Sequence, residues 1–234
     1  MIRLGLIILI VANSIMPIIG QDFFGESDIF LKKYVKEGKV AYSEIQQDSK
    51  VLDRLINFIA TYSLEQVPER EQKAFYINAY NILVIKGIVD NYPIQSPLDK
   101  EGFFEKVKYK VAGEALTLNE IENIKLRKEY NDPRIHFVLV CAAVSCPELI
   151  SSVYHPESLE KQIESSTIKS LNDPEFVRVS DTKIAISEIF KWYAEDFGGQ
   201  SNYIKFINKY RKNILPTNIA LSFYEYDWTL NEKK

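Results

Sequence analysis

Apolar positions recur at the spacing of one helix face in several stretches of the chain. Residues 50–62 carry such a stripe, and residues 157–172 and 203–210 repeat it. This spacing is typical of amphipathic helices that bury one side. Residues 70–90 differ, because their apolar side chains surround the whole segment and an acidic, proline-led turn precedes them. They predict a central helix that is buried on all sides.

Alternating apolar and polar residues predict two β-hairpins, each followed by a helix. The first hairpin covers residues 107–117 and the second covers residues 177–186. Thr117 and Glu120 have the spacing of a capping box, in which each side chain bonds the backbone N–H of the other residue. A strand-like run follows near the C-terminus, at residues 219–226. Hairpins and helices without a regular strand–helix alternation indicate an α+β fold.

The apolar, β-branched run from Ile135 to Val140 predicts a buried strand over residues 135–141. We therefore expect a single α+β domain, in which a mostly antiparallel sheet that includes this strand packs on helix 70–90. A histidine-bearing strand on a buried helix also occurs in papain-like and transglutaminase-like folds, which is a weak analogy. Those folds place the nucleophile at the start of the central helix, whereas residues 70–90 contain no cysteine.

The first twenty residues differ from the rest of the chain. Arg3 is followed by an apolar run and then by Gly20, an order typical of a secretory signal peptide. We expect residues 1–20 to be removed and the protein to be exported, to the periplasm or the extracellular space. The alternative is an uncleaved segment that anchors the protein in a membrane. Residues 21–69 are expected to form a helical segment that packs on the core.

Composition and charge narrow the classes of partner. The chain of 234 residues is 46% hydrophobic and 12% aromatic, enough for a sizeable and largely aromatic core. Its 29 basic and 32 acidic residues give a net charge of −3, which argues against a broad nucleic-acid surface. We expect a small-molecule or peptide ligand and no nucleic acid. No metal or cofactor is expected, because the two histidines and two cysteines lack zinc-finger spacing and no glycine-rich phosphate loop is present.

Five blocks of sequence follow one another in an order that is found in one protein family. The blocks are AFYINAYN at 74–81, LTLNEIENIKLR at 116–127, DPRIHFVLVCAAVSCPEL at 132–149, KWYAEDFG at 191–198 and YDWTLN at 226–231. Together they resemble the domain of unknown function family 547 (DUF547) over about residues 70–231. The resemblance implies no particular activity, since members occur in exported bacterial proteins and, beside other domains, in plant and animal proteins. Many members have histidine where this chain has Asn123, so the resemblance carries no catalytic role to that position.

The segment NDPRIHFVLVCAAVSCPEL, residues 131–149, holds one of the two histidines and both cysteines of the chain. Pro147 favours a short helix after the predicted strand, and Cys146 near its N-terminus would have a lowered thiol pKa. Our first hypothesis is a thiol-dependent hydrolase or acyl transferase, with Cys146 as nucleophile and His136 as its general base. The two side chains meet only if the intervening loop folds back along the strand, and His155 is a competing partner for the thiol.

The same residues also fit a non-catalytic hypothesis. In an oxidising compartment Cys141 and Cys146 can form a disulfide, and a bridged Cys146 is not a nucleophile at rest. The protein is then a periplasmic binding or scaffold domain, and His136 is a buried structural residue. A thiol–disulfide exchange protein fits less well, because such proteins usually have C-x-x-C spacing.

Other polar residues are candidates for supporting roles. Asn78 and Asn81 lie on one side of the predicted central helix, either as clamps for neighbouring backbone or as amide donors of a site. Arg134 is expected to pair with Glu122 or Asp196. Three aromatic residues of the C-terminal part are expected in the core: Trp192, Tyr193 and Trp228.

Overall fold

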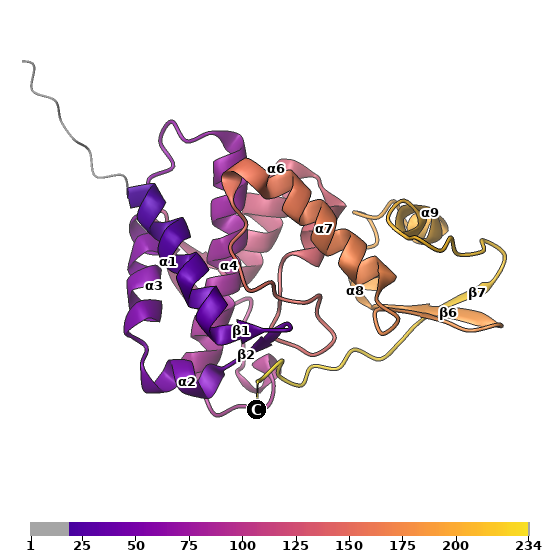
Figure 1. Cartoon of the computed structure of the whole chain (residues 1–234), viewed down its shortest axis with the longest axis horizontal. Coiled ribbons are helices and arrows are strands. Elements are labelled where there is room, and N and C mark those ends of the chain that lie inside the picture. Colours follow the sequence, from indigo (N-terminus) through magenta and orange to yellow (C-terminus); the bar gives the residue numbers. More distant parts are fainter. Residues whose placement is uncertain (1–18, 234) are drawn as a thin grey trace, which may run out of the picture.

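The structure is a computed structural model that describes residues 19–233, with side chains from Phe23 onward (Figure 1). The predicted signal peptide at residues 1–20 lies almost wholly outside the described residues, so the signal peptide and export remain predictions. None of the described helices combines the length and the apolarity that crossing a membrane requires.

Helices form one end of the molecule, at the left of Figure 1. Helix α4 (Glu69–Asn91) lies in contact with α2 (Tyr42–Gln47) and α3 (Lys50–Thr61), and α1 (Ile19–Tyr34) packs on α3. Most of α4 is buried because neighbouring segments cover it on several sides. The helices predicted at residues 50–62 and 70–90 are therefore confirmed.

Two short hairpins belong to this end of the molecule. β1 (Val35–Lys36) pairs with β2 (Lys39–Val40), and β3 (Lys108–Val111) pairs with β4 (Glu114–Thr117), both antiparallel. The hairpin predicted at residues 107–117 is confirmed. A single-turn 3-10 helix, η1 (Pro97–Asp99), precedes it.

The predicted capping box starts the helix that follows the β3–β4 hairpin. Glu120 N–H donates to Thr117 Oγ1 at 3.1 Å, and Thr117 N–H donates to Glu120 Oε2 at 2.8 Å. The short helix α5 (Leu118–Glu120) then continues as the π-helix η2 (Ile121–Arg127) and the turn α6 (Lys128–Tyr130). π-helical turns are rare in proteins, and those that occur often lie at functional sites. The side chains of η2 are therefore candidates for a site.

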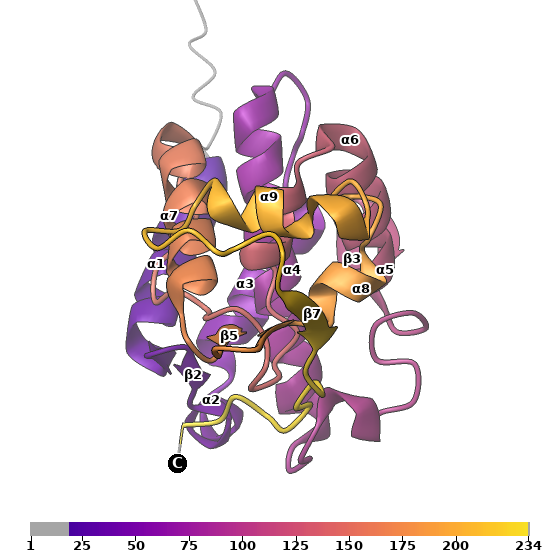
Figure 2. The ribbon, with the colours of Figure 1, turned by 90° about the vertical axis from the view of Figure 1, so that its right-hand side faces the viewer.

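The C-terminal part forms the other end of the molecule, at the right of Figure 1. β5 (Val177–Val179) pairs antiparallel with β6 (Lys183–Ile186), and β6 pairs parallel with β7 (Ala220–Phe223). The helical elements α8 (Ile189–Trp192), η5 (Gln200–Asn202) and α9 (Tyr203–Asn208) complete this end, whereas η4 (Pro156–Ser158) contacts α4 and α7 (Leu159–Asn172) runs across the middle of the molecule (Figure 1). In the turned view, α9 and β7 lie in front of α4 (Figure 2).

The α+β class is confirmed, but the predicted sheet is wrong. The described strands form three small sheets rather than one mostly antiparallel sheet on α4. Residues 135–141 are not a strand: η3 (Pro133–Phe137) is a 3-10 helix, and residues 138–141 belong to no strand.

Local polar groups explain this difference. Asp132 accepts a hydrogen bond from Arg134 N–H at 3.0 Å, and Pro133 occupies the first helical position, so the segment begins as a helical turn. Beyond η3, Asn81 Nδ2 donates to the Val138 carbonyl, and Asn81 Oδ1 accepts from Val140 N–H, each at 2.9 Å. A buried side-chain amide therefore satisfies backbone groups that a neighbouring strand would otherwise pair.

Residues 133–146 lie between two hydrophobic cores. The first core joins α1 to α4 with the hairpin β3–β4 and includes Val138. The second core surrounds Phe137, whose ring lies 5.9 to 6.3 Å from four other phenylalanine rings: Phe176, Phe190, Phe197 and Phe206. An apolar run that is buried between two cores needs no alternation of faces, which is why periodicity did not identify its conformation.

The C-terminal tail connects the two ends of the molecule. It leaves β7 and returns to the β1–β2 hairpin, as the yellow trace in Figure 1 shows. Val40 N–H donates to the Asn231 carbonyl at 2.8 Å, and Lys233 N–H donates to the Val40 carbonyl at 2.9 Å. Along the way Val144 N–H donates to the Thr229 carbonyl at 2.8 Å. The tail is thereby held along the loop that contains both cysteines.

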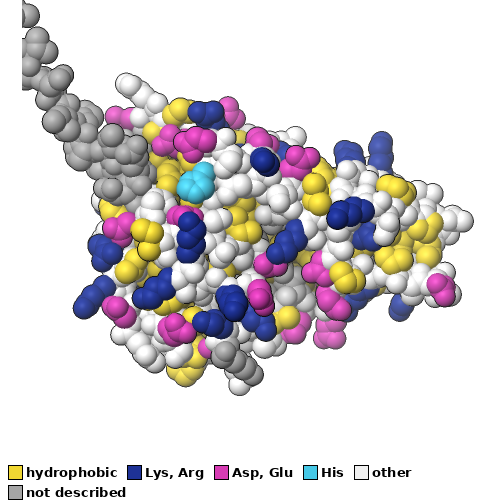
Figure 3. All heavy atoms as spheres, in the orientation of Figure 1, with side chains coloured by type: hydrophobic (Ala, Val, Ile, Leu, Met, Phe, Trp, Pro, Cys, Tyr) yellow, Lys and Arg dark blue, Asp and Glu magenta, His cyan; other side chains and the backbone are white. Residues whose placement is uncertain are grey.

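Acidic and basic side chains are interspersed on the face shown in Figure 3. One ion-pair network lies near η3, where the Asp132 carboxylate is 2.9 Å from Lys73 Nζ and 2.7 Å from Arg134 Nη2. Burial of the Asp132 carboxyl raises its pKa, but hydrogen bonds from Arg134 and Lys73 outweigh burial and lower the pKa to about 2.

We expect Asp132 to make stability depend on pH in the acid range. Its folded pKa of about 2 lies below the unfolded value of about 3.9, so its stabilisation is complete above the unfolded pKa and is lost as pH falls toward 2. The difference in unfolding free energy between the wild type and Asp132→Asn should shrink by about 1 kcal/mol between pH 6 and pH 3. Urea titrations at both pH values measure it. A difference that is the same at both would contradict the proposed pairing.

Candidate functional site

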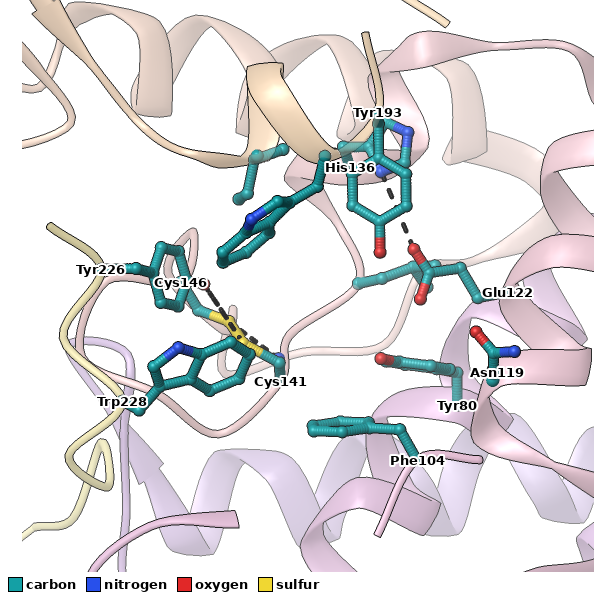
Figure 4. Close-up of a pocket in the computed structure, with 13 residues that line it drawn as sticks. Tyr80, Phe104, Asn119, Glu122, His136, Cys141, Cys146, Tyr193, Tyr226 and Trp228 are labelled. Carbon is teal, nitrogen blue, oxygen red and sulfur yellow. Dashed lines mark hydrogen bonds and ion pairs between the residues drawn. A yellow bond between two sulfur atoms is a disulfide. The ribbon is translucent and has the colours of Figure 1, made fainter. Parts of the chain in front are cut away.

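A cavity of about 340 Å³ lies between the two ends of the molecule (Figure 4). This volume is within the range of small-molecule sites. The lining residues come from α4, the segment before β3, α5, η2, η3, α8, the cysteine loop and the C-terminal tail. Most of them are aromatic or apolar, and their polar groups gather at one end of the cavity. The lining residues are Tyr80, Phe104, Asn119, Glu122, His136, Leu139, Cys141, Cys146, Ile189, Trp192, Tyr193, Tyr226 and Trp228.

One wall of the cavity is an aromatic cluster of Trp192, Tyr226 and Trp228. The two indole rings are stacked, with centroids 5.7 Å apart, and Tyr226 lies 4.8 Å from Trp192 and 4.9 Å from Trp228. Trp192 is 43% exposed although it was expected in the core. These are the only two tryptophans of the chain. Large exposed aromatic rings beside a cavity are typical of ligand contacts rather than of a closed core.

Glu122 and His136 form the polar end, and both are buried. Glu122 Oε1 lies 3.8 Å from His136 Nδ1, as the dashed line in Figure 4 marks. On the other side of the ring, His136 Nε2 lies 2.7 Å from Asp196 Oδ2, and the imidazole stacks on Tyr193 with centroids 4.0 Å apart. The Nε2 edge of the ring therefore faces Asp196, and its Nδ1 edge faces Glu122.

Asp196 is fixed by Arg127 as well as by His136. The Arg127 guanidinium donates to both carboxylate oxygens, at 2.7 and 2.8 Å, and lies over the Tyr193 ring at 4.6 Å. Burial raises the pKa of Asp196, but hydrogen bonds from His136 and Arg127 and their charges outweigh it and hold the pKa well below its usual range. Asp196 is therefore an ionised partner that orients the His136 ring.

Three tyrosine hydroxyls face the same cavity. Burial raises the pKa of Tyr80, Tyr193 and Tyr226, and the negative charge of Glu122 raises each further. The three phenols therefore stay protonated and available as donors at neutral pH.

Cys141 and Cys146 form a disulfide in the cavity wall, with Cα atoms 6.2 Å apart. The predicted alternative for these two residues is confirmed. The Tyr226 hydroxyl lies 3.2 Å from each sulfur. Between the cysteines, Ala142 has φ of +63°, a conformation that residues with a Cβ atom rarely adopt. Such backbone conformations often occur at functional sites.

The short helix predicted after Ser145 is wrong. Residues 147–152 are irregular, and Ser145 bonds to the tail instead of capping a helix. Its Oγ accepts from Asp227 N–H at 2.9 Å, and its N–H donates to the Asp227 carbonyl at 3.2 Å. Cys146 therefore has no helix N-terminus to lower a thiol pKa.

The other predicted site residues lie away from the cavity wall. Asn78 and Asn81 clamp backbone: Asn78 exchanges two hydrogen bonds with Tyr154, both at 2.9 Å, as Asn81 does with the segment after η3. Arg134 does not reach Glu122 or Asp196, contrary to expectation, because Asp132 beside it forms a closer pair. His155 is half-exposed, with Nε2 3.9 Å from Asp28.

Sequence reasoning did not identify Tyr80, Phe104 and Tyr226 as lining residues. The available signals were the positions of Tyr80 in the family block AFYINAYN and of Tyr226 in the family block YDWTLN. In residues 19–233, no group of three or more His, Cys, Asp or Glu side chains is arranged to hold a metal ion.

Comparison with known families gives one match. Residues 64–169 match the family described as "Protein of unknown function, DUF547". This part of the chain belongs to the DUF547 family. No curated protein and no solved structure matches the chain, so the analogy with papain-like folds has no support.

The DUF547 region supplies only one side of the cavity. It contains α4, η2, η3 and the disulfide, and hence Tyr80, Glu122 and His136. The tryptophan wall and Asp196 follow it in the sequence. The complete site therefore needs the residues that come after the matched region.

We expect reduction of the disulfide to destabilise the protein by roughly 2 kcal/mol, the value for closing a loop this short in the unfolded chain. Urea titrations with and without a reductant measure the difference. A variant with both cysteines changed to serine, Cys141→Ser with Cys146→Ser, is the control, since a reductant should leave its stability unchanged. An equal effect of the reductant on both proteins would contradict the prediction.

Proposed function

We propose that the DUF547 region and the C-terminal residues behind it form a binding domain for a small organic molecule or peptide side chain. The observation that carries this proposal is the cavity of about 340 Å³, with aromatic walls and a few convergent polar groups at one end. Such a combination is typical of ligand sites. The cavity is shared by two cores, so ligand binding would also hold the two ends of the molecule together.

The disulfide favours binding over resting thiol chemistry. Catalysis by a thiol requires a thiolate, and both sulfurs are committed to the bridge. A disulfide persists mainly in oxidising compartments, which also supports export of the protein.

A second candidate function is favoured by the Asp196–His136 pair. A carboxylate bonded to an imidazole is one part of a catalytic triad, and His136 and Cys146 line one cavity, with the Nδ1 edge of His136 facing Glu122. If the bridge were reduced, Cys146 could act as the nucleophile of a hydrolase or acyl transferase, with His136 as base. Reactivity that appears only after reduction, and that Cys146→Ser abolishes, would support this candidate.

Tryptophan fluorescence tests the binding proposal directly. Both tryptophans line the cavity, so a ligand that enters should change the emission without background from elsewhere. A set of small aromatic, aliphatic, neutral and charged fragments would be titrated into the protein. We expect saturable changes for some fragments.

A cavity-filling variant provides the control for this titration. Ile189→Phe narrows the cavity and should weaken binding by about tenfold or more, whereas Ile214→Phe on the surface should leave it unchanged. Thermal melts confirm that both variants fold. Binding that Ile189→Phe does not weaken, or the absence of binding by any fragment, would contradict the proposal.

A further inference from the structure

The polar end of the cavity holds the Glu122 carboxylate, with the hydroxyls of Tyr80 and Tyr193 beside it (Figure 4). The Glu122 carboxylate and the Nδ1 edge of His136 lie 3.8 Å apart, too far for a good hydrogen bond to each other. A cationic group placed beside them would meet the Glu122 carboxylate directly. None of the lysines and arginines that the structure describes lines the cavity.

The basic residues nearest to Glu122 along the chain are occupied elsewhere. Arg127 is bound to both oxygens of Asp196 and to Asn123 Oδ1, and Lys125 Nζ lies 2.7 Å from Glu114. By formal charge, the carboxylates of Glu122 and Asp196 and the guanidinium of Arg127 leave one net negative charge in this cluster. Of these three side chains, Glu122 is the one that lines the cavity.

The remaining walls are suited to the same kind of ligand. Six aromatic residues line the cavity, and the faces of such rings attract cations through their quadrupoles. A carboxylate together with several aromatic rings is an arrangement that binds ammonium groups. A neutral polyol can also stack on indole rings, but it gains nothing from a buried negative charge.

We infer that the cavity binds an organic cation, an amine or quaternary ammonium group with an apolar body, whose charged head lies between Glu122 and the aromatic rings. This inference rests on the proposed binding function and specifies its ligand class. The apolar body would lie along Leu139, Ile189 and the disulfide.

Three probes of nearly equal shape and different charge test the inference. Choline is the cation, 3,3-dimethylbutan-1-ol is its neutral carbon analogue, and 3,3-dimethylbutanoate is the anion. Titrations would follow the emission of the two tryptophans at pH 7 in low salt. We expect choline to bind about tenfold or more tightly than the alcohol, and the anion to bind more weakly still.

Glu122→Gln separates charge from shape, because glutamine keeps the size and an acceptor oxygen. The preference for choline over the alcohol should fall to about threefold or less, while the affinity for the alcohol stays the same. Glu195→Gln is the matched control, since Glu195 is exposed and outside the cavity, and it should keep the full preference. If Glu122→Gln does not fold, the order of the three affinities measured on the wild type still tests the inference.

The possible failures are distinguishable. Equal or tighter binding of the alcohol or the anion would overturn the inference and leave the binding function intact. The same conclusion holds if neutral fragments bind in the cavity and choline does not. If no fragment or probe of any charge changes the emission, the binding function itself fails.

Discussion

Replacing Asn81 by alanine is expected to lower the free energy of unfolding by about 3 kcal/mol. The Asn81 amide is buried and satisfies one backbone N–H and one carbonyl after η3, at Val140 and Val138. Alanine leaves both backbone groups buried without a partner, and each unsatisfied group costs about 1 to 3 kcal/mol. Urea or thermal unfolding of the purified variant measures the loss.

Asn91→Ala is the matched control for this prediction. Asn91 is also an asparagine of α4, but it lies at the end of the helix, is only partly buried, and bonds within its own helix through Gly87. Its replacement should cost less than about 1 kcal/mol. If the two variants lose similar stability, the Asn81 amide does not organise the segment after η3.

Phe137→Ala should cause a still larger loss, about 4 kcal/mol, the usual cost of removing a fully buried ring. The Phe137 side chain is inaccessible to solvent and lies at the centre of the second core, among Phe176, Phe190 and Phe206. Because His136 precedes it, the loss should also displace the imidazole from Asp196. Calorimetry and urea unfolding measure the effect on stability.

Phe137→Leu preserves most of the buried apolar volume and serves as the control. Its cost should be below about 2 kcal/mol, because the cavity that it leaves is smaller. A Phe137→Ala protein as stable as Phe137→Leu would mean that the ring is not a central packing element. Asn81 and Phe137 therefore hold the same short segment, Asn81 by hydrogen bonds and Phe137 by packing.

The helices and hairpins were largely predictable because their signals are local. The all-round apolar pattern of residues 70–90 identified α4 to within about one residue at each end, and Thr117 with Glu120 identified the start of α5. The class α+β followed from these elements. The number and size of the sheets did not follow, because strand pairing depends on residues far apart in the sequence.

The segment after Asp132 could not be predicted from its own residues. An apolar run such as Ile135 to Val140 suits a buried strand and a buried irregular segment equally well. What decides between them is Asn81, more than fifty residues earlier, whose amide takes the place of a neighbouring strand. Ser145 likewise suits a helix cap until the C-terminal tail occupies its hydroxyl.

The candidate site was predictable in its residues more than in its arrangement. His136, Glu122 and both cysteines were singled out by their scarcity or by the family blocks, and all line one cavity. Trp192 and Trp228 of the aromatic wall were expected to be core, because periodicity does not distinguish a ring in a core from a ring at a cavity. The pairing of Asp196 with Arg127 depends on tertiary contacts that the sequence does not specify.

The disulfide is part of the fold and also part of the candidate site. It closes the cavity wall beside Tyr226, and it removes the thiol that the first hypothesis required. Cys146 is therefore interpreted as part of a binding surface at rest, with His136 and Glu122 as the polar end of that surface.

The thiol state of the purified protein shows whether Cys146 is bridged at rest. The protein would be purified from its compartment without reductant, denatured in the presence of an alkylating reagent, and weighed intact. Because Cys141 and Cys146 are bridged, we expect no alkyl groups and a mass two hydrogens below that of the reduced chain. Two alkyl groups on most molecules would contradict it, and Cys146 would then have to be considered again as a nucleophile.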